Sequence, residues 1–289
     1  MFATIGIFVV LFSVIGGFLI EGGNISIIFQ PVEFLIIGGS AVGAFIIIST
    51  PQKFKTIVSS VKEVFFSKPY DTNDYKELLG LMQNIFRFIQ KNGPIKLEQT
   101  LDDPENSKVF SNFSRFLQKK PQVEFLVDSL RVMINAKIPH YDLENLFDSE
   151  IEYFFHEHMK SSKLINYIAD SLPGLGIVAA VLGVVLTMQH ISDPPEVLGH
   201  SIGAALVGTF LGIFLCYGIV GPIAKKIEYN ANEEKEFLYV IKVILICYAS
   251  GLNSNITLEF GRRAIPLPIR PDFFEVETTL KEFKKFEKI

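Results

Sequence analysis

The sequence lacks the residues that mark several classes of protein. Its 289 residues contain no tryptophan and only two cysteines, Cys216 and Cys247, whose context suits neither a disulfide nor a metal site, so packing is their expected role. A net charge of −4 without a basic stripe argues against nucleic-acid binding. No phosphate-binding glycine loop, HExxH pattern or plausible nucleophile–base pair is present, so no enzyme, cofactor or metal site is predicted.

Lysine and arginine are absent from two long stretches, residues 1–50 and 164–224. The chain is 49% hydrophobic with a mean hydropathy of +0.34, too apolar for one soluble domain. All 27 basic residues lie in 51–163 and 225–289, directly beside the apolar runs. The positive-inside rule therefore places both basic regions, and with them both termini, on the cytoplasmic side.

Four apolar runs have the length of about 20 residues that crosses a bilayer as a helix. They are Phe2–Ile20, Phe34–Thr50, Ser171–Gln189 and Ser201–Ala224. The first has no basic residues before it and no cleavage site after it, which argues against a signal peptide. The short connections at 21–33 and 190–200 are then external.

The remaining sequence predicts helices and no strands, so the fold class is an all-α, four-span membrane protein with a helical cytoplasmic domain. The predicted regions are 1–50 with spans one and two, 51–170 as a cytoplasmic domain, 171–224 with spans three and four, and 225–289 as cytoplasmic helices. Asp71 is an expected helix N-cap and Gly93-Pro94 an expected stop. Asp103-Pro104 predicts a helix to about Gln118. One long helix is expected from Tyr141 into span three, and another over Ala224–Tyr248.

Spans three and four are rich in small residues at four-residue spacing, which lets helix backbones approach closely in lipid. These residues are Gly176, Ala179, Ala180 and Gly183 in span three, and Ala204, Gly208 and Gly212 in span four. The pair is predicted to form the wall of a membrane assembly.

No Asp, Glu, Lys, Arg or His lies in the interior of the predicted spans. Glu21 and Glu33 are expected at the external edge, where a carboxylate is more often solvated than functional. A proton relay needs an ionisable group within the membrane. If ions cross here, another polypeptide must therefore supply the titrating group.

The few polar features of the spans each have two interpretations. Pro173 and Pro222 are either ordinary helix starts and kinks or hinges that connect the membrane to the cytoplasmic helices. The Thr209 hydroxyl either bonds to its own helix or faces an ion path. Thr187 is a further candidate for that path.

Several motifs resemble the flagellar motor stator A subunits, the MotA branch of the MotA/TolQ/ExbB proton channel family. The resemblance is strongest in the run DSLPGLGIVAAVLG over 170–183 and continues through VGTFLGI at 207–213 to Tyr217-Gly218 and Pro222. It returns in Glu259–Arg262 and in Arg270-Pro271. It covers nearly the whole chain.

The resemblance implies a ring of A subunits, a pentamer in this family, around a dimer of B subunits in the bacterial inner membrane. Each B subunit brings an essential membrane Asp and a peptidoglycan-binding domain. Ion flow would turn the ring, whose cytoplasmic domain pushes the C-ring of the flagellar rotor.

Individual positions carry over from the family. Pro173 and Pro222 match its coupling prolines, and Ala180 and Thr209 match positions that line the ion path. Sodium-driven relatives usually have Thr at the position of Ala180. Because alanine offers no oxygen ligand, the resemblance favours H⁺ over Na⁺.

The expected rotor-facing residues lie in the cytoplasmic domain. Glu98 matches a charged residue of the family's rotor interface, and Glu150 matches another acidic position. The family's basic position is Gln90 here, a departure that neighbouring Lys91 or Arg87 could compensate. The alternative is that Lys91 and Arg87 belong to a solvated charged face.

Two other functions compete with this interpretation. An energy transducer of the ExbB/TolQ type normally has three spans, whereas four are predicted here. A gated channel or solute transporter would be expected to show inverted repeats and a charged midplane site, and neither is evident.

Overall fold

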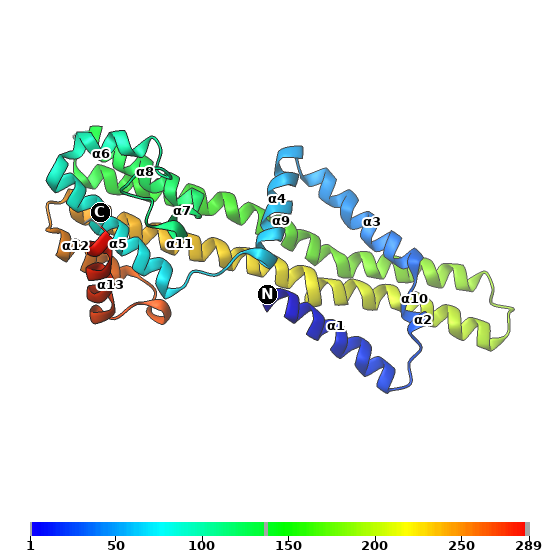
Figure 1. Cartoon of the computed structure of the whole chain (residues 1–289). Coiled ribbons are helices and arrows are strands. Elements are labelled where there is room, and N and C mark those ends of the chain that lie inside the picture. The colour runs from blue at the N-terminus through cyan, green and yellow to red at the C-terminus, as the bar shows by residue number, and fades with distance from the viewer. Residues whose placement is uncertain (1, 136–137, 287–289) are drawn as a thin grey trace. The chain divides into compact units, whose positions relative to one another are not determined.

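The computed structural model describes residues 2–135 and 138–286, and within them every regular element is a helix (Figure 1). The chain divides into two compact units, each built from two separated stretches. Unit 1 comprises Met1–Lys68 and Glu157–Ala231, and unit 2 comprises 69–156 and 232–289. Helices α9 and α11 each contribute residues to both units.

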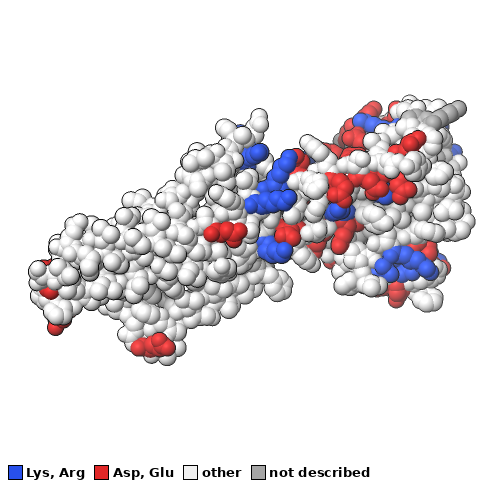
Figure 2. Space-filling view, turned by 180° about the vertical axis from the view of Figure 1, so that it is seen from behind, with Lys and Arg blue, Asp and Glu red and all other residues white. Residues whose placement is uncertain are grey.

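Unit 1 contains the apolar helices. Its elements are α1 (Phe2–Ile20), α2 (Ile25–Ile28), α3 (Pro31–Ile48), α4 (Pro51–Phe66), part of α9 (His140–Met188), α10 (Pro195–Leu215), the π-helical turn η1 (Cys216–Val220) and the start of α11 (Gly221–Ala249). Four helical segments of the described chain are long and apolar enough to span a membrane, as predicted. The view in Figure 2 shows their surface as a largely uncharged expanse.

The predicted cytoplasmic helix from Tyr141 and the predicted third span form one continuous helix, α9, which passes through Pro173 without ending. The predicted helix over Ala224–Tyr248 is likewise confirmed within α11. Span four therefore continues into α11 through η1 without a loop.

Helix α4 is not among the predicted elements. The Thr50 hydroxyl caps its start, and Pro51 occupies the first helical position. Ile57 and Val64 are buried against apolar residues of unit 1, whereas Phe66 is exposed. The helix is therefore amphipathic, with its buried face fixed by the spans.

Unit 2 holds the remaining helices. They are α5 (Thr72–Asn92), α6 (Pro94–Leu101), α7 (Ser114–Leu117), α8 (Lys120–Asn135), α12 (Ser254–Ala264), a 3₁₀ turn (Leu267–Ile269) and α13 (Phe273–Phe286), together with parts of α9 and α11. The predicted N-cap is confirmed, because Asp71 and Asp74 form a capping box at the start of α5. Gly93, at φ 83°, separates α5 from α6 as predicted.

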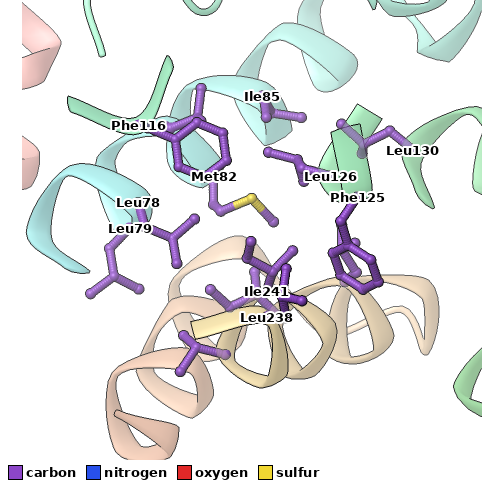
Figure 3. Close-up of a cluster of buried hydrophobic side chains, with 14 of the residues drawn as sticks. Leu78, Leu79, Met82, Ile85, Phe116, Phe125, Leu126, Leu130, Leu238 and Ile241 are labelled. Atoms are coloured by element: carbon purple, nitrogen blue, oxygen red, sulfur yellow. The ribbon is translucent and has the colours of Figure 1, made fainter. Parts of the chain in front are cut away.

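Large side chains from α5, α7, α8 and α11 form the core of unit 2 (Figure 3). Met82 lies at the centre of this view, between Phe116 and the α11 residues Leu238 and Ile241. All four are almost completely buried. Burial of each such side chain contributes about 1.5–3 kcal/mol, so this core holds the unit together.

The predicted helix from Asp103-Pro104 to Gln118 is wrong. Residues 102–113 form turns, and only Ser114–Leu117 is helical. Asp103 accepts from the Asn106 backbone N–H at 3.3 Å, so it caps a turn. Burial of Phe110 and Phe113 in the core outweighs the local helix signal.

Candidate functional site at the contact between α9 and α10

Small residues bring the backbones of α9 and α10 into direct contact. A Cβ atom on Gly176 would lie 2.6 Å from the Gly208 carbonyl oxygen, and one on Gly212 would lie 2.5 Å from the Leu172 carbonyl oxygen. A Cβ on Gly208 would lie 3.1 Å from the Ala179 Cβ. The atoms close to Gly176 and Gly212 are backbone atoms, so glycine is required at these two positions for the helices to pack at this separation.

One of the small residues predicted to lie at the helix contact is not there, and the next residue along the chain takes its place. Ala205, not Ala204, meets Gly183, where a Cβ on the glycine would lie 2.8 Å from the Ala205 Cβ. Ala205 is buried and Ala204 is only partly buried. Strict four-residue spacing fails here because the helical repeat of 3.6 residues drifts across the contact.

Pro173 lies within α9, at a point where the helix is continuous. Proline has no backbone N–H, so the Ala169 carbonyl loses its usual helical donor. Two residues away from the proline, the Ser171 hydroxyl donates to the Ile168 carbonyl oxygen at 2.7 Å. Pro173 therefore removes one backbone hydrogen bond of α9 without ending the helix.

Pro222 lies two residues after the end of the π-helical turn η1. The Gly221 N–H donates to the Cys216 carbonyl oxygen, five residues earlier. This wider turn relieves the clash that proline otherwise makes with the carbonyl four residues before it. Two residues after Pro222, the Ala224 carbonyl oxygen accepts from the Ser162 hydroxyl at 2.8 Å, a buried link between α11 and α9. Ser162 was not identified from the sequence.

The three candidate ion-path residues have different environments. The Thr187 hydroxyl is buried and donates to the Gly183 carbonyl oxygen of its own helix at 2.9 Å. Thr209 and Ala180 are half-buried. Within the described residues, the Thr209 side chain forms no hydrogen bond. Its Oγ1 is therefore open to another group, whereas that of Thr187 is already engaged.

Glu33 is the main correction to the sequence interpretation. Helix α3 begins at Pro31, earlier than the predicted span start at Phe34, and brings Glu33 into its first turn. The side chain is 8% exposed and lies against Gly208 of α10, so it is not a solvated edge carboxylate. The signal that could have revealed this is Pro31, a residue typical of the first helical position.

The five candidate rotor-facing residues all belong to unit 2. Glu98 accepts a hydrogen bond from the Asn135 amide at 2.7 Å, and the Gln90 amide donates to the Ser254 hydroxyl at 3.1 Å. Lys91 is exposed and borders a cavity of about 490 Å³ that Lys108 also lines. Arg87 is partly buried and Glu150 is exposed. Polar contacts within the unit thus hold Glu98 and Gln90.

The motif Glu259–Arg262 forms a clamp between α12 and the segment that leads to α13. Arg262 makes two hydrogen bonds of 2.8 Å to the Glu259 carboxylate and donates to the Pro271 carbonyl oxygen at 3.1 Å. These bonds, with that from Arg263, lower the pKa of Glu259 to about 2. A Cβ on Gly261 would lie 2.4 Å from Ile244 Cγ1. The motif is therefore structural.

Two family models match the chain, and each match includes residues of both units. Residues 4–93 match the family model for the motility protein A N-terminal region, and residues 114–238 match the MotA/TolQ/ExbB proton channel family. The chain is 33% identical over 277 residues to motility protein A of Salmonella typhimurium, covering 96% of this chain and 94% of the relative. It is 33% identical over 284 residues to motility protein A of Escherichia coli, covering 98% and 96%.

Solved structures of similar fold include that of Campylobacter jejuni MotAB. It superposes with a TM-score of 0.77 at 19% identity and covers 94% of this chain and 98% of the solved chain. The helical fold of almost the whole chain thus recurs in a solved MotAB structure.

Proposed function

This chain belongs to the motility protein A family, and from that premise we propose how it works as the A subunit of a flagellar stator. With a B subunit it forms a membrane channel that converts ion-motive force into torque. The observation that carries the mechanism is the close contact of α9 and α10, which presents half-buried Ala180 and Thr209, neither of which can titrate. The B subunit would supply the missing carboxylate.

The proposed assembly is a pentamer of A subunits around two B subunits in the bacterial inner membrane, with both termini of the A chain in the cytoplasm. The distribution of basic residues supports this orientation. Each elementary charge that crosses a potential of 100 mV releases about 2.3 kcal/mol. Protonation of the B-subunit carboxylate would use that energy to turn the A ring.

Protons are the proposed ion. The half-buried methyl group of Ala180 offers no ligand to a sodium ion, which prefers oxygen donors. Thr209 alone provides a hydroxyl among the residues that carry over from the family's ion path.

Pro173 and Pro222 are the proposed hinges. Pro173 removes a backbone hydrogen bond of α9, and Pro222 follows the π-helical turn. The Ser162 hydroxyl of α9 bonds to the Ala224 carbonyl of α11 and so links the two helices. A change in packing around the B subunit would therefore be passed along α9 and α11. The continuity of both helices beyond the spans supports this route.

The rotor C-ring is the proposed partner of unit 2. We place Glu98, Lys91, Arg87, Gln90 and Glu150 at or near that interface. Because Gln90 is neutral and bonded to Ser254, exposed Lys91 is the better candidate for the basic partner.

The proposal is tested by complementing a strain that lacks its own A subunit. The wild-type chain, expressed with its B subunit, should restore swimming, and native mass spectrometry should find five A and two B subunits. Normal membrane assembly without swimming, together with restored siderophore uptake in a strain lacking the ExbB-type transducer, would contradict it.

Two variants test the ion path and the hinge. Thr209→Ile fills the proposed path with an apolar side chain, and Pro173→Ala restores the helical donor. Both should reduce torque on a tethered bead severely while membrane insertion and B-subunit binding persist. Wild-type swimming under load by either variant would disprove the corresponding role.

A further inference from the structure

Glu33 is a buried carboxylate that the function proposed above does not use. It occupies the first turn of α3 and is 8% exposed, and its Oε2 is buried without a hydrogen-bond partner among the described residues. An isolated carboxylate is strongly disfavoured in an apolar environment, because it loses hydration without gaining a partner. Binding a proton removes that cost.

The carboxyl group fits a space that two glycines leave open. A Cβ on Gly208 would lie 2.6 Å from Glu33 Oε2, and one on Gly183 would lie 3.8 Å from Oε1. The same Cβ position on Gly208 is 3.2 Å from the Ala180 backbone nitrogen. The Glu33 carboxyl, which comes from α3, therefore lies at the same part of the α9–α10 contact as Ala180.

The helices that contact this carboxyl present no charge to it. Gly183 of α9 and Gly208 of α10 are the residues against it, and no ion pair joins Glu33 to a described side chain. The titratable groups toward the same ends of these helices are His190, Asp193, Glu196 and His200, and all are exposed or half-exposed. Neither a countercharge nor a hydrogen-bond donor competes with a proton for the buried oxygen.

We infer that Glu33 is a proton-binding carboxyl that this chain itself contributes to the wall of the ion path, loaded from the external side. A hydronium ion transfers its proton to a Glu33 carboxylate oxygen and leaves as water. The acid then passes that proton, through water, to the carboxylate of the B subunit. This step rests on the proposed stator function and topology; the protonation of Glu33 itself does not.

Dicyclohexylcarbodiimide tests the protonation directly, because this apolar reagent adds to protonated carboxyl groups in membranes. The full chain, co-expressed with its B subunit, is treated in membranes and its peptides are analysed by mass spectrometry. Glu33 should be labelled, and labelling should fall as the external pH rises. Glu21, an exposed carboxylate of the same external connection, is the matched control and should stay unlabelled. Labelling of Glu33 no stronger than that of Glu21 would overturn the inference.

Proton flux tests the role of the bound proton. The A–B complex in proteoliposomes is compared with Glu33→Gln, which keeps the shape of the side chain, and with Glu21→Gln. Loss of a positioned proton-transfer group typically lowers rates by about 10²- to 10⁴-fold, so Glu33→Gln should reduce inward flux at least about tenfold and flatten its dependence on external pH. Glu21→Gln should match the wild type.

The outcomes separate this inference from the proposed function. Unchanged flux and pH dependence in an assembled Glu33→Gln complex would show that Glu33 does not feed the path. If the wild-type complex carries no flux at all, the stator function fails, while pH-dependent labelling of Glu33 still decides whether the site binds a proton.

Discussion

The helices of the two units are packed through different kinds of residue, small ones in unit 1 and large ones in unit 2. In unit 1 the closest helix contacts are made by glycine and alanine, while large apolar residues such as Phe12 and Ile47 are exposed, at 74% and 85%. In unit 2 the large residues are inside, and Phe237 and Phe116 are almost fully buried. In lipid, exposing an apolar side chain costs little, so close backbone contact holds helices together instead.

Removing a large side chain from unit 2 should have the largest effect. Phe237→Ala deletes a fully buried ring that contacts Tyr70 and Tyr75 and should lower the unfolding free energy by about 3–5 kcal/mol. Hydrogen exchange should show the loss in unit 2. Phe274→Ala removes a ring that is 74% exposed and should change little. Equal effects of the two variants would contradict the assigned core.

Adding a methyl group to unit 1 should come next. Gly212→Ala places a Cβ 2.5 Å from the Leu172 carbonyl oxygen and should cost up to about 3 kcal/mol, with loss of motility. Thermal aggregation of the solubilised protein measures the destabilisation. Gly203→Ala makes the same change in the same helix, where nothing lies within 4 Å, and should be tolerated. Tolerance of both variants would mean that the helices are not in backbone contact.

Charge should matter for the stability of unit 2. The ordinary pKa of Glu259, 4.5, is lowered to about 2 in the folded chain, chiefly by its hydrogen bond to Arg262. The carboxylate therefore stabilises the fold fully above about pH 4.5, and this contribution is lost as the pH falls toward 2. We expect about 2 kcal/mol, because solvent screening reduces the full value of such a shift.

Glu259→Gln measures that contribution. Urea unfolding followed by hydrogen exchange in α12 should show the variant less stable at pH 7, with a difference that shrinks below pH 4.5. A difference that is constant over this range would show that the carboxylate charge is not its source.

A single hydrogen bond between helices of unit 1 should have the smallest effect. Ser162→Ala removes the buried link to the Ala224 carbonyl oxygen and should cost about 1 kcal/mol. Ser149→Ala is the control, since that exposed hydroxyl bonds only within its own helix, to the Asn145 carbonyl. Thermal unfolding of the solubilised complex distinguishes them, and an effect no larger than the control would remove Ser162 from the proposed coupling route.

The sequence allowed the spans and the long helices to be predicted because their signals are local. Runs of apolar residues, the Asp71 cap and the Gly93-Pro94 stop each act over a few residues. The helix predicted from Asp103-Pro104 failed because contacts with the core of unit 2 decide the conformation of Phe110 and Phe113. Such contacts join residues far apart in the chain and leave no local pattern.

Parts of the candidate site escaped prediction for the same reason. The small residues predicted that α9 and α10 are in contact. Whether Ala204 or Ala205 lies at that contact depends on how one helix is rotated against the other. Burial of Glu33 depends on where α3 lies against α10. In the sequence, Glu33 is simply an acidic residue beside an apolar run, and that pattern is as typical of an exposed carboxylate as of a buried one.

The π-helical turn at Cys216–Val220 has a consequence for the geometry of the fourth span. One surplus residue in a turn rotates everything beyond it by about 100° relative to an uninterrupted α-helix. Gly212 and Ala224 are twelve residues apart and would differ by about 120° in an uninterrupted α-helix, yet because of this turn both meet α9, at Leu172 and at Ser162. Deleting one residue from the turn would therefore convert it to an ordinary α-helical turn and leave Lys225 and Lys226 on the same side of the helix.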